Sequence, residues 1–357
     1  MNRTITSLSL NNIYSGLFFS SYSFSNHFLT IKRVNFRYSF GNLLFFDKIP
    51  NLLINDAGFH CIIGKAIKIG TLSYNLVDYI EQVMTFSDSV VSLSNCRFIR
   101  CKGSNSSPVI VQNSVTSFIL TRTIFDGCSS LTGSGGGINV KSKECLFNSI
   151  CFNNCFANSS SPLSWGGASQ ISGTTLNVSF VSVNDISSRD GALQINSPTT
   201  NIGNFNCSNS RTHEASCGLQ FASTQKLEVN YMVFYKDYAN HMIGFWGSGN
   251  QINANYMSVV KCTLFQTTGY IGYIRSMITA TAYISNILII ESSVSPIASG
   301  TGPISVSNSN ITNSATYYLF SFLNTYKCQH FPIIIQSPLI YQLNTFWIKL
   351  FYMSILS

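Results

Sequence analysis

The sequence predicts an all-β protein folded as a parallel β-helix, in which each coil holds three short strands within about 27 residues. Two recurring features and the composition support this prediction. Phe98, Phe125 and Phe152 each open a Phe-x-x-Cys unit, and the two steps between them are both 27 residues. A short apolar segment that starts near a glycine or proline follows these units with a similar period. Because two separate features keep one period, we expect a repeat architecture.

The composition favours strands over helices. Of the 357 residues, 45% are hydrophobic and only 10% are charged, so the chain has material for a large core and few charges to cover it. Aromatic and β-branched side chains suit a pleated surface, and Asn, Ser and Gly suit its turns. No long stretch keeps the 3.6-residue apolar period of a helix, which argues against the helical repeat classes.

The net charge of +8 comes from 21 basic and 13 acidic residues, which are scattered along the chain. The longest basic block is only "IKR", at 31–33. This distribution indicates a weakly basic, solvated surface, and we expect no nucleic-acid partner.

The first part of the chain carries strand-like runs without the repeat markers. "FLTIKRVNF", "NLLFF", "NLLIN" and "HCIIGKAIKIG" come at coil-like spacing, and no Pro- or Ser-rich linker follows them. We therefore expect residues 1–90 to form degenerate N-terminal coils or a cap, 91–325 to form the repeats, and 326–357 to be a hydrophobic C-terminal segment.

The repeats themselves form two aligned series. The first covers 191 residues in seven steps, about 27 residues per step, through Phe98, Phe125, Phe152, Val183, Phe205, Phe234, Val259 and Ile289. The second begins its segments at Pro108, Gly136, Gly166, Asp190, Cys217, Met242, Tyr270 and Pro303. In a β-helix, equivalent residues stack at ~4.8 Å from one coil to the next. We expect such stacks at Phe98, Phe125 and Phe152, at Cys101, Cys128 and Cys155, and at the corner glycines Gly136, Gly166, Gly191 and Gly218.

The eleven cysteines leave three interpretations open. The favoured one is that the stacked cysteines are small buried hydrophobic residues. The second is secretory disulfides, such as Cys151–Cys155 or Cys96–Cys101. A zinc site is the least favoured, because the chain has no C-x-x-C pair and its five histidines do not cluster with the cysteines. We expect no metal and no cofactor.

Export is indicated by glycosylation motifs, although a chain this rich in Asn, Ser and Thr also forms them by chance. The candidates in the repeat region are Asn105, Asn158, Asn177, Asn206 and Asn310. The N-terminus lacks the continuous apolar core of a signal peptide. The apolar C-terminal segment is interrupted by Pro338 and Lys349, and it is interpreted as either a β-helix cap or a degenerate membrane anchor.

The motifs "FDGC…GGGINV" and "FNNC…GGASQI" resemble the repeats of polymorphic outer-membrane proteins, a family of surface proteins known from chlamydiae and expanded in trichomonad parasites. The resemblance covers roughly residues 90–310, and later coils lose the Phe or the Cys. It implies a right-handed parallel β-helix at the cell surface or outside the cell. It also implies an adhesion-like or antigenic role, toward a host-cell or extracellular glycan or protein that the motifs do not name.

A carbohydrate-active β-helix enzyme, of the pectate lyase or polygalacturonase type, is the alternative. Such chemistry needs clustered carboxylates, and the thirteen acidic residues here are dispersed. The nearest group is Asp185, Arg189 and Asp190, which we interpret as a polar corner. Three aromatic residues, Trp165, Trp246 and Tyr273, suit either sugar stacking or packing. We therefore expect a non-catalytic surface protein without catalytic residues.

Overall fold

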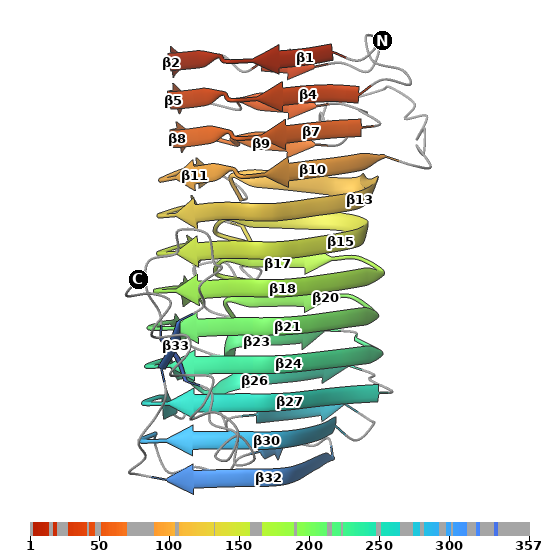
Figure 1. The fold of residues 1–357 in the computed structure, drawn as a ribbon, viewed down its shortest axis with the longest axis vertical. Helices are drawn as coiled ribbons and strands as arrows, with labels where there is room; N and C mark the ends of the chain where they lie inside the picture. Colours follow the sequence, from red (N-terminus) through yellow and green to blue (C-terminus); the bar gives the residue numbers. More distant parts are fainter. Residues whose placement is uncertain are drawn as a thin grey trace, which may run out of the picture.

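The fold is that of a computed structural model, which describes residues 3–13, 17–19, 28–40, 43–46, 51–69, 89–103, 107–131, 133–157, 166–188, 191–212, 216–222, 224–247, 251–264, 274–278, 282–292, 298–300, 303–312, 319–321 and 332–334. Within these residues every regular element is a β-strand, and 32 of the strands belong to one continuous sheet. The sheet winds into a parallel β-solenoid (Figure 1). The predicted all-β solenoid is confirmed.

One column of strands runs the length of the solenoid. Twelve strands pair in parallel along it, each with its equivalent in the next coil. They are β1 (Arg3–Thr6), β4 (Phe28–Lys32), β7 (Asn51–Asn55), β10 (Val90–Ser94), β13 (Val109–Asp126), β15 (Ile138–Asn153), β18 (Thr175–Asn184), β21 (Thr199–Ser208), β24 (Lys226–Tyr235), β27 (Gln251–Val260), β30 (Ala282–Ile290) and β32 (Ile304–Thr312).

A second column follows the first around the coil. It begins with β2 (Ser9–Ile13), β5 (Asn35–Phe40), β8 (Gly58–Ile63) and β11 (Arg97–Ile99), and from β13 onward the ends of the long strands continue it. In seven of the coils a short strand follows this column: β12 (Lys102–Gly103), β14 (Ser129–Ser130), β16 (Phe156–Ala157), β19 (Ser187–Ser188), β22 (Arg211–Thr212), β25 (Tyr238–Ala239) and β28 (Thr263–Leu264).

The third column closes the coil. Its strands are β3 (Leu17–Phe19), β6 (Leu44–Phe46), β9 (Ile67–Ile69), the first residues of β13 and β15, β17 (Ser169–Ser172), β20 (Leu193–Asn196), β23 (Ser216–Ala222), β26 (His241–Gly247), β29 (Ile274–Ile278) and β31 (Ala298–Gly300). Apart from the sheet, β33 (Leu319–Ser321) and β34 (Pro332–Ile334) form an antiparallel pair.

The coil length agrees with the predicted period. Eleven pairing steps lead from Arg3 to the last coil at Ile304, so the mean step is about 27 residues. The steps from Val91 to Phe118 and on to Cys145 are both 27 residues, whereas the step from Leu52 to Val91 is 39. In Figure 1 the near strands run right to left and the far strands left to right as the chain descends, which is the sense of a right-handed coil.

Two columns of corners bend every coil, and both use left-handed backbone. The first lies between the first and second strand columns, at Ser7, Arg33, Asp56, Asn95, Arg122, Ser149, Phe180, Asn204, Tyr231, Tyr256, Asn286 and Asn308. The second lies near the end of the second strand column, inside β2, β5 and β8 and directly after the strand in later coils, at Asn12, Tyr38, Cys61, Arg100, Gly127, Asn154, Asp185, Asn209, Lys236, Lys261 and Glu291. Their φ angles lie between 45° and 61°, a region that Asn and Gly enter at less cost than most residues.

These corners explain the Phe-x-x-Cys unit. In "FDGC", Phe125 points into the core at the end of a strand, the third residue, Gly127, makes the left-handed corner, and Cys128 points back into the core. The spacing is therefore set by one corner of the coil.

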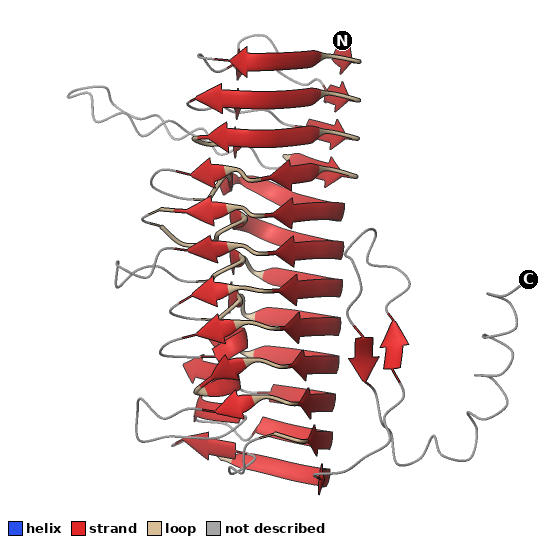
Figure 2. Ribbon diagram, turned by 90° about the vertical axis from the view of Figure 1, so that its left-hand side faces the viewer, coloured by secondary structure: helices blue, strands red, loops and turns tan. Residues whose placement is uncertain are grey.

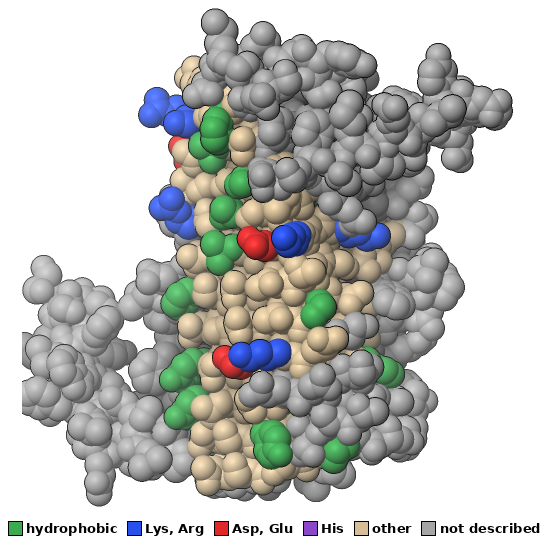
Figure 3. Space-filling view, turned by 90° about the vertical axis from the view of Figure 1, so that its right-hand side faces the viewer, with side chains coloured by type: hydrophobic (Ala, Val, Ile, Leu, Met, Phe, Trp, Pro, Cys, Tyr) green, Lys and Arg blue, Asp and Glu red, His purple; other side chains and the backbone are tan. Residues whose placement is uncertain are grey.

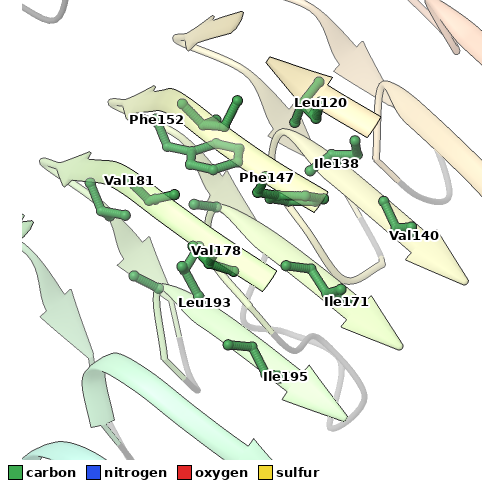
Figure 4. Packing of buried hydrophobic residues seen from close by; sticks show 14 of the residues in the cluster. Leu120, Ile138, Val140, Phe147, Phe152, Ile171, Val178, Val181, Leu193 and Ile195 are labelled. Carbon is green, nitrogen blue, oxygen red and sulfur yellow. The ribbon is translucent and has the colours of Figure 1, made fainter. Parts of the chain in front are cut away.

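The core is made of inward side chains stacked in rows along the solenoid. One row joins Val140, Ile171 and Ile195, and another joins Leu120, Phe147 and Val178 (Figure 4). The aromatic column has centroid distances of 5.4, 4.7, 4.8 and 5.0 Å through Phe36, Phe59, Phe98, Phe125 and Phe152. The stacked arrows in Figure 2 show the same alignment of coil upon coil.

The first repeat series differs from the structure in one alignment. Cys207, and not Phe205, is the partner of Val183 and Phe234. Phe205 lies in the neighbouring inward row, opposite Val181 and Met232. Because strand side chains alternate with a period of two, a shift by two residues keeps both side chains in the core. In the second series, Pro303 precedes Ile304 of the first strand column, whereas the third column continues with Ala298–Gly300.

The two ends of the chain are described unequally. β1 to β9, within residues 1–69, pair coil by coil with one another, and β7, β8 and β9 pair with the coils that follow. Of the C-terminal segment 326–357, only Pro332–Ile334 lies within the described residues. Among the described residues no helix is long and apolar enough to cross a membrane.

Candidate functional site

The outer faces of the solenoid carry mostly uncharged polar side chains. Figure 3 shows one side, where the described surface holds only a few Lys, Arg, Asp and Glu side chains among uncharged ones. Two described ion pairs are Lys226–Glu228 at 3.5 Å and Lys261–Glu291 at 3.3 Å, and all four side chains are well exposed. Exposed pairs of this kind add little to stability. Because charged side chains are few, the polar groups of these faces are chiefly amides and hydroxyls.

A groove of about 410 Å³ lies across the outer face of β24, β27, β30 and β32. We call it the amide groove, and its outward residues include Asn230, Asn253, Asn255, Tyr283, Ser285 and Ser305. The Tyr283 ring is 58% exposed there. The amides supply paired donors and acceptors, and the ring supplies a flat apolar face. This combination suits a polar, uncharged ligand such as a sugar chain.

Hydrogen bonds between coils hold parts of these faces rigid. The Asn255 carboxamide oxygen accepts bonds from Ser285 Oγ at 2.8 Å and from Asn286 Nδ2 at 2.6 Å. Elsewhere Asn184 Nδ2 donates to Asn153 Oδ1 at 2.7 Å, and Asn209 Nδ2 donates to Asn184 Oδ1 at 2.9 Å. Such amide ladders tie each coil to the next, so a ligand meets a preformed surface.

A second groove, of about 550 Å³, lies near the N-terminal end. Its walls include Arg33, Arg37, His60 and Arg97, with polar side chains between them. We call this site the basic groove. A third, of about 210 Å³, contains Asp185 and Ser187. Each of the three grooves contains one carboxylate, from Glu228, Asp56 or Asp185.

None of these grooves pairs two carboxylates, which is the arrangement that glycoside hydrolysis uses. Within the described part of the chain, no group of three or more His, Cys, Asp and Glu side chains is placed to hold a metal ion. Of the acidic group considered from the sequence, Asp185 sits at a left-handed corner, and Arg189 and Asp190 lie outside the described residues.

The repeat cysteines lie inside the solenoid. Cys101, Cys128 and Cys155 are fully buried, and each Sγ donates to a backbone oxygen of the preceding coil, of Phe59, Phe98 and Phe125 respectively, at 3.3–3.5 Å. Burial, together with the neighbouring sulfur of Cys128, raises the pKa of Cys101 and of Cys155 well above the usual value. Burial likewise raises the pKa of Cys96 and of Cys145 to about 12. The four thiols with a raised pKa, Cys96, Cys101, Cys145 and Cys155, are protonated at neutral pH and pack as small hydrophobic residues.

The two disulfides considered from the sequence are not formed. Cys96, Cys101 and Cys155 are free thiols, and Cys151 is disulfide-bonded but not to Cys155. Cys151 neighbours the inward Phe152 on its strand and therefore faces outward, whereas Cys155 points into the core. Their side chains are on opposite sides of the coil wall.

The corner glycines stack in a slightly different register from the predicted one. Gly136 N donates to Gly167 O at 2.8 Å, and Gly167 N donates to Gly191 O at 2.8 Å, so these three form the column. Gly166 instead accepts from Gly135 N at 3.0 Å. A Cβ on Gly136 would lie 2.2 Å from Gly167 O, which explains why the position is glycine.

Gly218 belongs to the next row of the corner. It precedes Leu219, whose partner is Leu193, and a Cβ there would lie 2.2 Å from the Phe234 ring. Glycine is required at this position by an aromatic side chain of the core.

The glycosylation candidates divide by exposure. Asn177 is exposed, and its Oδ1 accepts from Asn201 Nδ2 at 2.9 Å. Asn206 is only 2% exposed, so its side chain is buried in the folded protein. Asn310 lies in β32 with its side chain outside the description, and Asn105 and Asn158 lie outside the described residues.

Of the three aromatic candidates for sugar stacking, one lies within the described residues. Trp246 is partly buried on β26, and Trp165 and Tyr273 lie outside the described residues. The exposed ring that the structure places in a groove is Tyr283, which no sequence motif marked.

Sequence reasoning also missed the basic groove, although its signal is visible afterwards. Its residues flank the aromatic column in "NFR" at 35–37, "GFH" at 58–60 and "RFI" at 97–99. Aligning these triplets on their phenylalanines would have brought Arg37, His60 and Arg97 onto neighbouring strands.

These observations define a class, an all-β parallel solenoid with preformed polar and basic grooves on its outer faces. Comparison of the chain with protein-family models, with curated proteins and with solved structures finds no match.

Proposed function

We propose that this protein is a non-catalytic surface protein of the polymorphic outer-membrane-protein type, which presents its solenoid faces to an extracellular or host-cell ligand. The amide groove is the observation that carries the proposal. It spans four coils, it is rigidly preformed, and its uncharged amides and exposed tyrosine suit recognition of a glycan or of a polar protein surface.

The sequence motifs support the same proposal. The Phe-x-x-Cys and glycine units resemble those of the surface family, and the glycosylation motif at Asn177 lies on the exposed face. Attachment to a membrane through the C-terminal segment 326–357 is part of the proposal.

Two experiments test this proposal. In intact cells, antibody or added protease should reach the protein without permeabilisation; protein found strictly inside the cell would contradict a surface role. On a glycan array, the purified chain should retain a ligand and Tyr283→Ala should weaken its binding at least tenfold. Tyr38→Ala removes a ring of similar exposure, 56%, far from the amide groove and should leave binding unchanged.

The enzyme alternative is tested beside them. A polyuronate lyase and hydrolase assay on the same preparation should give no product above the buffer control. Release of unsaturated or reducing ends that follows the protein through purification would replace the binding role with a catalytic one.

A further inference from the structure

The basic groove is built by three successive coils. Arg37 on β5 is the strand partner of His60 on β8, and Gly58 on β8 is the partner of Arg97 on β11. Arg33 adds a fourth basic side chain from the left-handed corner before β5. Four basic groups from three successive coils thus meet within two strand spacings, about 10 Å.

Glycine at position 58 leaves the groove open. A Cβ there would lie 3.0 Å from Asn35 Oδ1 and 3.1 Å from His60 Nε2, so even a methyl group would crowd the floor. The cavity of about 550 Å³ lies within the range of ~300–1,000 Å³ that is typical of small-molecule sites. The space is therefore large enough for one or two sugar rings.

The charges of the groove are not neutralised from within the described structure. Arg33, Arg37 and Arg97 are exposed, and no ion pair joins them to a carboxylate among the described residues. The one acid in the groove, Asp56, accepts a hydrogen bond from Asn55 Nδ2 at 3.1 Å. The pKa of His60 is lowered, first by burial and then by the charges of Arg37 and Arg97, which confirms that the three groups are close.

We infer that the basic groove binds the sulfate or carboxylate groups of an anionic glycan, an inference that rests on the proposed surface role and names a ligand class for it. Guanidinium groups bind such oxyanions with two parallel hydrogen bonds. The Asn35 and Asn95 amides that line the groove suit sugar hydroxyls. A nucleic acid fits less well, because no Phe, Tyr or Trp ring is among the described residues that line the groove, so bases have no stacking partner.

Binding measurements on the purified full chain test this inference. The probes are a heparin-derived oligosaccharide (sulfated), an oligogalacturonate (carboxylated), a neutral oligosaccharide of equal length, and single-stranded DNA. We expect binding to at least one anionic glycan that is more than tenfold tighter than to the neutral one or to DNA. Equal or tighter binding of DNA would contradict the inference, and so would the absence of binding to both anionic glycans.

A matched pair of variants locates the site. Arg37→Gln with Arg97→Gln should weaken the anionic-glycan binding at least tenfold, whereas Lys141→Gln with Arg211→Gln removes two exposed charges away from the groove and should change it less than twofold. Circular dichroism of both variants should match that of the parent. Equal losses in the two variants would reduce the effect to general charge and overturn the site.

The two proposals fail separately. Loss of the anionic-glycan result, with the protein still accessible on intact cells and binding through Tyr283, would contradict the basic groove alone. Strictly intracellular protein that still binds anionic glycans through Arg37 and Arg97 would contradict the surface role and leave the groove intact.

Discussion

Single residues of the aromatic column show how the solenoid is stabilised. Phe125 is fully buried, and its ring stacks on Phe98 at 4.8 Å and on Phe152 at 5.0 Å. The rings above and below therefore shield each ring from water. Offset stacking of this kind adds about 0.5–1.5 kcal/mol beyond the burial of apolar area.

Replacing Phe125 with alanine should reduce the free energy of unfolding by about 3–5 kcal/mol, because it removes a buried ring and leaves a cavity between two others. The measurement is equilibrium urea denaturation followed by circular dichroism. Phe156→Ala is the control, because that side chain is 40% exposed, and we expect a change of about 0.5 kcal/mol or less. Similar losses in both variants would show that the column is not the core.

The buried thiols make a second prediction at the residue scale. Burial raises the pKa of Cys96 and of Cys145 to about 12, so at pH 8 both should resist iodoacetamide in the folded protein and react once denaturant is added. Mass spectrometry of the alkylated peptides measures this directly. Rapid native labelling of either residue would place it at the surface.

The basic groove should bind its ligand more tightly in acid. Arg37 and Arg97 face His60 from the neighbouring strands and Asp56 lines the same groove, and the lowered pKa of His60 keeps the imidazole neutral at pH 7. Protonation below that pKa adds a positive charge, worth about 1 kcal/mol or roughly fivefold in affinity for a bound anion. Titration calorimetry with a sulfated oligosaccharide from pH 7.5 to 5 should show the gain. The His60→Gln variant should lose this gain in affinity. If the variant keeps the pH profile of the parent protein, His60 is not the group responsible.

At the scale of the element, the corner that leads from the short strand β14 to the third strand column depends on close contact between backbones. Gly136 lies against Gly167 O and Phe156 N, and neither backbone atom can retreat without shifting a whole coil. Gly136→Ala should therefore lower the free energy of unfolding by about 1–3 kcal/mol, through overpacking.

Gly203→Ala is the matched control, because a Cβ at position 203 meets nothing within 4 Å and the position lies on an outer strand face. It should leave stability unchanged or raise it by about 0.4–1 kcal/mol, by restricting the unfolded chain. Urea midpoints of the two variants measure the difference. A Gly136→Ala protein as stable as the parent would show that the coils do not approach this closely.

How far the sequence predicted these elements depends on what each pattern encodes. The stacking of Phe98, Phe125 and Phe152 could be predicted, because an identical spacing of 27 residues records an identical coil. The register at Phe205 could not, because a strand with inward residues at alternate positions allows a shift by two without exposing any of them.

The grooves were harder to predict for a related reason. Arg37, His60 and Arg97 are 23 and 37 residues apart, and they meet because β5, β8 and β11 pair in neighbouring coils. The two coil steps are 23 and 39 residues, so no constant period in the sequence relates the three residues. Tyr283 looks like any strand aromatic until its face of the sheet is known. Position along the solenoid, and not local sequence, makes these residues a site.

At the scale of the whole molecule, the solenoid carries two chemically different grooves near its two ends. The basic groove lies over the coils of β5, β8 and β11, and the amide groove over β24 to β32, toward opposite ends of the stack in Figure 1. The amide groove lies on the outer face of the first strand column and the basic groove on that of the second, so a proposed glycan ligand would have to pass from one face to the other to contact both. Two sites on one rigid body raise the effective concentration of the second contact.

The direct stacking of successive coils is tested most directly by distances between spin labels on the first strand column, attached through introduced non-natural residues that leave the native thiols untouched. Val90 and Glu144 are two coils apart, and Val90 and Lys226 are five coils apart. The strand spacing predicts backbone separations of about 10 Å and about 24 Å. Separations that do not increase by about 5 Å per coil would contradict the solenoid, and with it the grooves that only the stacked coils bring together.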